Sequence, residues 1–151
     1  QILSITRQKL VEAEKSPLVL HSPWSIVICA DTEVVFNNQL MGKPNNPDEA
    51  VKTLGQLSGN SHFVKTGYII KDLKNQKEVS HIETCLVHFK KLSHETITEY
   101  VATGEPMDKA GSYGIQGLGG NLVEKFEGLM SNIVGLPVEV LVPHLQSLLK
   151  S

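Results

Sequence analysis

The sequence predicts a single α/β domain, and two observations lead to that class. Segments with the apolar spacing of helices alternate along the chain with β-favouring apolar runs, an order that is typical of helices packed against a sheet. The chain has 151 residues, of which 40% are hydrophobic, so it is long enough for one substantial core and short for two. We therefore expect residues 1–151 to form one domain.

The chain is predicted to begin with a helix and a strand. Apolar positions set among charged ones over residues 1 to about 15 indicate an amphipathic helix that ends before Pro17. The apolar run from Trp24 to Ala30 indicates a buried strand, which puts Asp31 and Thr32 near its carboxyl end. Ligands gather at the carboxyl ends of strands in open α/β sheets, so Asp31 has the position of a site residue.

A short hairpin and a second helix follow. The stretch from Val34 to Met41 is predicted to turn back at its two adjacent asparagines, which brings Lys43 towards Asp31. The order Asn-Pro-Asp-Glu beginning at Asn46 is a helix start, because asparagine caps free amides and proline suits the first turn. This helix is expected to run to Leu57.

The second half of the chain begins with two predicted strands and a helix. Residues 63–70 and 79–89 cluster or alternate apolar side chains around a polar turn, which indicates two antiparallel strands. Ser93 is predicted to cap a helix that stops at Gly104.

A loop with five glycines between Gly111 and Gly120 comes next. It lacks the strand, helix and spacing of a Walker or Rossmann loop, so those two nucleotide-binding folds are excluded. Residues 122–126 indicate a returning strand, and residues 138–149 indicate a last helix that packs on the sheet.

Composition narrows the class of ligand. The net charge is −2, from 14 basic and 16 acidic residues, and no long basic run gives a case for nucleic-acid binding.

No apolar run reaches the roughly 20 residues of a membrane span, and the first residues lack the layout of a signal peptide, so we expect a cytoplasmic protein. The six histidines show no paired spacing for zinc, and both cysteines, Cys29 and Cys85, look like core residues.

Several blocks in order resemble the Maf family of nucleoside triphosphate pyrophosphatases. They are Ala30-Asp31-Thr32, Gly42-Lys43-Pro44, the Leu-Ser-Gly-x-x-His run at 57–62, the Glu-Pro-x-Asp-Lys-Ala-Gly-x-Tyr-Gly-Ile-Gln run at 105–116, and the Asn-Ile-Val-Gly-Leu-Pro run at 132–137. Each block alone is a weak signal, whereas five in register are strong.

The resemblance implies a fold and a reaction. The fold is a strongly twisted mixed β-sheet flanked by helices, with a central cleft between two lobes. The reaction is hydrolysis of a nucleoside triphosphate such as dTTP or UTP, or a modified pyrimidine nucleotide, to monophosphate and pyrophosphate. The resemblance also implies that the protein is a nucleotide diphosphatase with a house-cleaning role. It further implies a Mg²⁺ or Mn²⁺ cofactor and a homodimer.

The resemblance also assigns catalytic roles. Asp31 matches the family's catalytic aspartate, which would hold the cation or accept a proton from the attacking water. Lys43 and Lys9 match lysines that steady the phosphates as point charges. In a sequence that lacks these family blocks, an aspartate such as Asp31 more often caps a turn, and single lysines such as Lys43 and Lys9 are more often solvated.

Four more residues are candidates for the site. Thr32 and Gln116 match positions that read a pyrimidine base, although the same side chains could instead cap a turn and brace the glycine loop. Lys109 is a candidate phosphate ligand, and Asp108 a candidate second metal ligand. These two could equally form a structural salt bridge with each other. Glu33 either faces solvent or adds a further acidic ligand.

One departure from the family pattern leaves a second function open. Family members open with a strand and a Ser-x-Ser-Pro-Arg-Arg loop that grips the triphosphate, and we expect this segment to be absent from residues 1–151. The alternative to the enzyme is therefore a catalytically inactive nucleotide-binding or interaction module. A third possibility is an appendage of a larger fused enzyme, although the sequence shows no partner domain.

Overall fold

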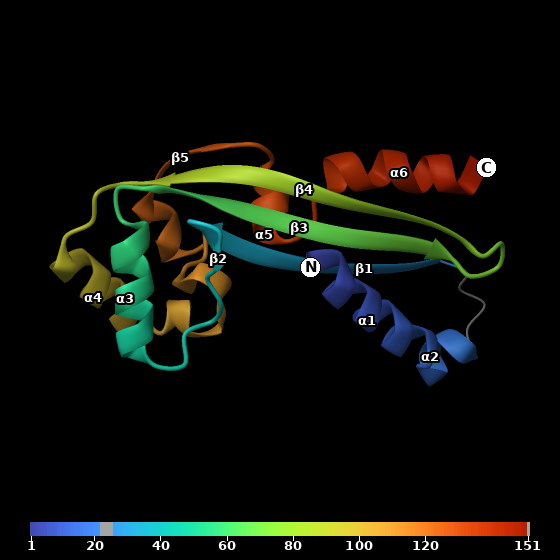
Figure 1. Ribbon diagram of the computed structural model, residues 1–151, viewed down its shortest axis with the longest axis horizontal. Helices are drawn as coiled ribbons and strands as arrows, with labels where there is room; N and C mark the ends of the chain where they lie inside the picture. Colours follow the sequence, from blue (N-terminus) through green and yellow to red (C-terminus); the bar gives the residue numbers. More distant parts are fainter. Residues whose placement is uncertain (22–25, 151) are drawn as a thin grey trace.

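The computed structural model describes residues 1–21 and 26–150, and its centre is a twisted five-stranded sheet with helices against it (Figure 1). The strand order is β2-β1-β3-β4-β5, and neighbouring strands are antiparallel throughout. The strands are β1 (Ile26–Phe36), β2 (Gln39–Leu40), β3 (Ser61–Asp72), β4 (Lys77–Phe89) and β5 (Val123–Glu127). The predicted α/β class is confirmed, with the correction that the pairings described are all antiparallel rather than mixed.

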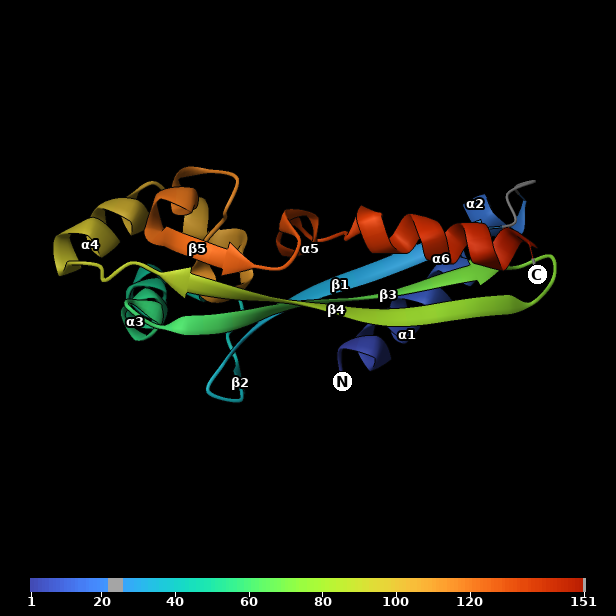
Figure 2. The same cartoon turned by 90° about the horizontal axis from the view of Figure 1, so that it is seen from above.

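The helices form two groups along the sheet. Figures 1 and 2 show α1, α2 and α6 beside one half of the long strands, and α3, α4 and β5 at the other end. The helices are α1 (Ile2–Glu14), α2 (Pro17–Leu20), α3 (Pro47–Leu57), α4 (His94–Ala102), α5 (Met130–Val134) and α6 (Val138–Lys150), with 3₁₀ turns η1 (Glu105–Asp108), η2 (Ala110–Ser112) and η3 (Leu118–Leu122). Of the helices described, none has the length and apolar character that crossing a membrane requires.

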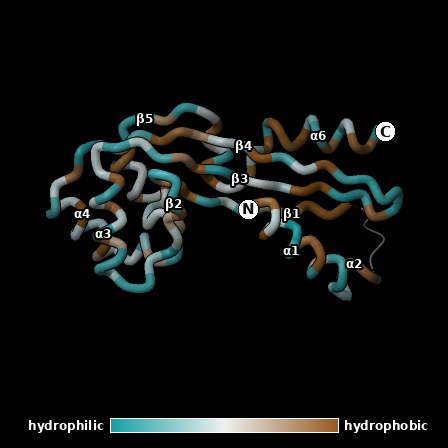
Figure 3. Tube along the Cα trace, in the orientation of Figure 1, coloured by the Kyte–Doolittle hydropathy of each residue, from teal (hydrophilic) through white to brown (hydrophobic). Residues whose placement is uncertain are grey.

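Two hydrophobic cores correspond to the two groups of helices. The larger core joins α3 and α4 to the sheet and contains Leu54 and Val87, both fully buried. The smaller core forms under α6, around Tyr68, Ile70 and Leu141. Figure 3 shows hydrophobic stretches of the chain in both regions. The long strands β1, β3 and β4 pass through both regions and join them into one sheet (Figure 2).

The first strand is longer than predicted, and this changes the setting of two site residues. The prediction that Asp31 and Thr32 lie at a strand end is wrong, because β1 continues to Phe36 and pairs Asp31 with Gly67 on β3. The consecutive polar residues Asp31, Thr32 and Glu33 suggest the end of a strand, but their backbones continue to pair with β3. Successive side chains on a strand point to opposite faces, so Asp31 and Thr32 project from different sides of the sheet. The predicted start of this strand at Trp24 lies outside the described residues.

The turns and caps follow local sequence chemistry. Asn37 and Asn38 have φ of 50° and 63°, which are the left-handed values of the predicted tight hairpin. Asn46 caps α3 by accepting from the Glu49 amide at 2.9 Å, and Ser93 caps α4 by accepting from the Thr96 amide at 3.1 Å. The predicted hairpin and these helix starts are confirmed.

The remaining predicted elements are also confirmed. Helix α1 buries one stripe of side chains, Ile2, Thr6 and Leu10, at the spacing of successive helical turns. Strands β3 and β4 form the predicted antiparallel pair, β5 returns along β4, and α6 covers the end of the sheet. Cys85 is buried, Cys29 is half-buried, and neither forms a disulfide.

Candidate active site

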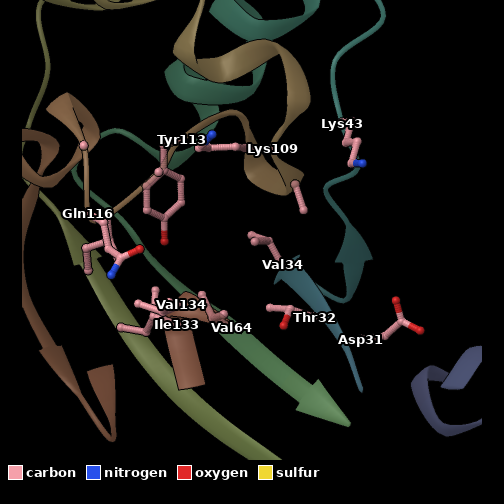
Figure 4. Close-up of a pocket in the computed structure, with 14 residues that line it drawn as sticks. Asp31, Thr32, Val34, Lys43, Val64, Lys109, Tyr113, Gln116, Ile133 and Val134 are labelled. Atoms are coloured by element: carbon pink, nitrogen blue, oxygen red, sulfur yellow. The ribbon is translucent and has the colours of Figure 1, made fainter. Parts of the chain in front are cut away.

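A pocket of about 390 Å³ lies where the sheet, the glycine-rich loop and α5 meet (Figure 4). Strand β1 contributes Asp31, Thr32 and Val34, and the glycine-rich segment contributes residues 109–110 and 113–117. The other walls are Lys43, Val64 of β3, and Ile133 and Val134 of α5. The fold therefore gathers at one cavity residues from four of the five family blocks, and the block at 57–62 does not line it.

The pocket has a charged end and a less polar end. Figure 4 shows Asp31 and Lys43 on one side, with Gln116, Ile133 and Val134 on the other. This division suits a ligand that has a highly charged part and a planar, partly apolar part, because apolar walls with a few polar groups are typical of sites for ring systems.

The Asp31 carboxylate has one engaged oxygen and one free oxygen. Its Oδ1 accepts from Lys9 Nζ at 2.5 Å, and the same ammonium group lies 3.4 Å from the Ala30 carbonyl oxygen. Its Oδ2 is buried and has no hydrogen-bond partner within the described residues. Buried polar atoms are nearly always paired, so Oδ2 is a candidate for contact with a ligand or a cation.

The site provides a single carboxylate for a cation. Across residues 1–21 and 26–150, no group of three His, Cys, Asp or Glu side chains could hold a metal ion. Magnesium is commonly held by one or two carboxylates, with substrate phosphates and water completing its shell. The free Oδ2 of Asp31 fits that role.

Asp108 does not join Asp31 in the pocket. It lies on η1 with a side chain that is 80% exposed, and it accepts from Lys109 Nζ at 2.9 Å. The hydrogen bond and positive charge of Lys109 hold the pKa of the Asp108 carboxyl below its usual range. Lys109 lines the pocket and can turn towards an anion there, whereas Asp108 forms the predicted alternative, a salt bridge with Lys109.

A backbone contact ties the loop of Lys43 to the glycine-rich segment. The amide of Gly111 donates to the Met41 carbonyl at 2.9 Å and to the Gly42 carbonyl at 3.3 Å. Gly111 has φ of 72°, and a Cβ there would lie 3.0 Å from the Val34 methyl groups. Only glycine fits this turn, which places Lys43 and Lys109 at the rim of one cavity.

The glycine-rich loop is anchored by Glu105, which the sequence did not single out. Its carboxylate accepts from the amides of Leu118 at 3.0 Å and Gly119 at 2.9 Å, and also from the Tyr100 hydroxyl. That hydroxyl in turn accepts from the Gly114 amide at 3.0 Å. Burial raises the pKa of the Glu105 carboxyl, but these three donors outweigh it and leave the pKa below its ordinary value.

The glycines make this anchor possible. A Cβ on Gly117 would lie 2.7 Å from Cδ of Glu105, and one on Gly119 would lie 2.6 Å from the Tyr100 hydroxyl. The loop therefore closes around the carboxylate and presents Gln116 to the pocket (Figure 4). The sequence signal for the anchor is the Glu-Pro pair with which the family block at 105–116 opens.

Two further side chains were missed because their contacts join distant parts of the chain. Tyr113 lines the pocket, and its hydroxyl pairs with Nε2 of buried His62 at 2.7 Å. Thr66 of β3 lies 2.8 Å from Thr32, hydroxyl to hydroxyl. Glu33 stands opposite Lys65 on β3 and is not among the residues that line the pocket.

Comparisons with known proteins identify the family of this chain. The model of the family described as Maf-like protein matches residues 2–148. A dTTP/UTP pyrophosphatase of Bdellovibrio bacteriovorus is 46% identical over 142 residues, which cover 93% of this chain and 73% of the relative.

Relatives of the same name occur in distant organisms. The protein of Desulfitobacterium hafniense is 51% identical over 76% of this chain and 51% of its own length, and that of Pyrococcus furiosus is 43% identical over 91% of this chain and 71% of its own length. The chain thus spans between about half and three quarters of the length of these relatives. With a family match that extends over nearly all of its residues, the chain belongs to the Maf family.

Proposed function

We propose that this chain is a nucleoside triphosphate pyrophosphatase that converts dTTP, UTP and related or modified pyrimidine nucleotides to monophosphate and pyrophosphate. The observation that carries the proposal is the pocket with Asp31 and Lys43 at one end, Gln116 at the other and Thr32 between them. The relatives named dTTP/UTP pyrophosphatase, which align with most of the chain, support the choice of substrate.

The reaction is a substitution at the α-phosphorus. A water oxygen bonds to that phosphorus, the bond to the bridging oxygen of the β-phosphate breaks, and pyrophosphate leaves while the water loses a proton. The charged end suits this chemistry, because Lys43 and Lys109 can offset phosphate charge. Lys9, already bonded to Asp31 Oδ1, adds a third positive charge beside the carboxylate.

Asp31 is the residue to which we assign the central role. Its Oδ2 would hold Mg²⁺ or Mn²⁺ or accept the proton of the attacking water, and a bound cation would supply further charge neutralisation on the phosphate oxygens. Asp108 is the weaker candidate for a second ligand, because it pairs with Lys109 outside the pocket lining.

Thr32 and Gln116 are proposed to read the base. A hydroxyl and an amide can satisfy the carbonyl and imide groups of uracil and thymine. The apolar side chains of Ile133 and Val134 offer a surface for the ring.

The test is incubation of the chain with dTTP, UTP, CTP or GTP and Mg²⁺, with product identification by chromatography. Monophosphate and pyrophosphate from dTTP and UTP are expected. Asp31→Asn should lower the rate by at least about a hundredfold, whereas the matched exposed control Asp48→Asn should leave it unchanged. No product from any nucleotide would instead support a catalytically inactive module.

Cofactor, assembly and location complete the proposal. Chelation by EDTA should abolish turnover, and added Mg²⁺ or Mn²⁺ should restore it. A homodimer, which the resemblance suggests, would give twice the mass of the chain in light scattering. We place the activity in the cytoplasm, where cell fractionation would find it.

A further inference from the structure

A chain of hydrogen bonds runs from the pocket into α5. The hydroxyl oxygens of Thr32 and Thr66 lie 2.8 Å apart, and the Thr66 hydroxyl donates to the Asn132 backbone carbonyl at 2.9 Å. Thr66 and Asn132 have no exposed surface, whereas Thr32 lines the pocket (Figure 4). The three residues belong to β1, β3 and α5, so this series of hydrogen bonds links two strands of the sheet to the helix beside the pocket.

Counting protons fixes the direction of these bonds. A threonine hydroxyl has one hydrogen and two lone pairs, and a carbonyl oxygen can only accept. Thr66 must therefore use its single hydrogen on Asn132, which leaves it only an acceptor towards Thr32. Thr32 must then donate to Thr66, so the Thr32 oxygen can offer only lone pairs to the pocket.

Asn132, the last residue in this series of hydrogen bonds, is itself held in place. The Asn132 side chain donates to the Val64 carbonyl at 3.2 Å, two residues before Thr66 on β3. Asn132 is thus bound to β3 through both its backbone oxygen and its side chain. Because the carbonyl is fixed against the strand, Thr66 keeps one orientation.

We propose that Thr66 and Asn132 are positioning residues that make Thr32 an obligate acceptor for the ring N–H of uracil or thymine. This inference depends on the proposed function of the same pocket. Uracil and thymine carry a hydrogen on N3 and can donate it to Thr32. Cytosine carries a lone pair on N3, which would face the lone pairs of the Thr32 oxygen and leave both unpaired.

The test compares UTP with CTP, which differ only at positions 3 and 4 of the base. In Thr66→Val the shape is kept but the acceptor is lost, so the Thr32 hydroxyl becomes free to donate to cytosine N3. The ratio of kcat/KM for UTP over CTP should fall about tenfold, mainly through KM, because one unpaired polar contact has been relieved. Thr66→Ser keeps the hydroxyl and should keep the ratio.

Controls separate positioning from packing. Thr84→Val makes the same substitution at an exposed site on β4 and should change neither rate nor ratio. A purely structural role for Thr66 would lower the rates on UTP and CTP equally, and an unchanged ratio in Thr66→Val overturns the proposal. If that variant does not fold, as judged by circular dichroism, Thr66→Ala removes the same acceptor with less bulk.

A binding experiment distinguishes this inference from the proposed function. If the wild type hydrolyses no nucleotide, the pyrophosphatase proposal fails, and calorimetric titration with UTP and CTP still tests the acceptor. A preference for UTP that is lost in Thr66→Val supports the inference. Equal affinity of the wild type for UTP and CTP refutes it.

Discussion

At the scale of single residues, His62 is a buried side chain whose charge state depends on pH. It is 1% exposed, its Nε2 pairs with the Tyr113 hydroxyl, and its ring lies edge to face with Phe89. Burial lowers the pKa of His62 to about 4, and the neighbouring charge of His88 acts in the same direction. The imidazole is therefore neutral when it supports Tyr113 at the pocket.

This pKa predicts a pH dependence of stability. Between pH 6.5 and about 4 the unfolded chain protonates His62 while the folded chain does not, so the free energy of unfolding falls as pH falls through that window. The loss should reach on the order of 3 kcal/mol. Urea unfolding of the wild type and His62→Gln from pH 7 to pH 4 measures it.

The variant serves as the control because its side chain does not titrate. All other titrating groups are shared, so the difference between the two pH curves isolates His62. Parallel curves would show that His62 titrates alike in the folded and unfolded chains, against the prediction.

At the scale of elements, α1 connects stability to the site. It packs on β1 and β3 through its buried stripe. Lys9, one helical turn after Thr6, bonds to Asp31. A Cβ on Gly67 of β3 would lie 3.2 Å from the side chains of Ile2 and Leu3, so the helix and strand approach closely. The position of Lys9 thus depends on how α1 packs.

Leu10 gives the test of this packing. It is 1% exposed, and Leu10→Ala should lower the free energy of unfolding by about 2–4 kcal/mol through lost burial and a cavity. Val11 on the same helix is 44% exposed, and Val11→Ala should cost less than about 1 kcal/mol. Urea denaturation measures both variants, and equal effects would mean that α1 is not held by its buried stripe.

At the scale of the whole molecule, the two cores differ in size. Among residues 1–21 and 26–150, the larger one contains thirteen buried residues, including Leu54 and Phe89, whereas the core under α6 contains four. Helix α6 also has Pro143 inside it, which removes one backbone donor. Less buried surface and fewer internal bonds should make the α6 region easier to open locally.

Hydrogen exchange can measure this difference directly. Backbone amides of residues 138–150 should exchange at least about tenfold faster than those of residues 47–57, since a smaller core gives a lower opening free energy. Mass spectrometry after peptide digestion resolves the two segments. Equal protection would show that the long strands couple both regions into one cooperative unit.

Local sequence chemistry was sufficient for most elements of the fold. The caps at Asn46 and Ser93, the paired asparagines of the hairpin and the apolar stripe of α1 each act within a few residues, so their effect can be read directly from the chain. The exceptions were the short helices α2 and α5, which were not predicted, and β1, where the polar residues from Asp31 to Glu33 hide a strand that only its pairing with β3 reveals.

The sequence by itself determined the order of the longer helices and strands, the family and the residue types of the pocket, because periodicity, caps and motifs are local properties. Only the tertiary structure decided that Lys9 meets Asp31, that Asp108 stays outside the pocket lining, and that Thr66 fixes the hydroxyl of Thr32. The Thr32 and Thr66 contact joins positions 34 residues apart, and the Thr66 and Asn132 contact joins positions 66 apart. Such bonds form only after the strands have paired and α5 has packed, so no local pattern could specify them.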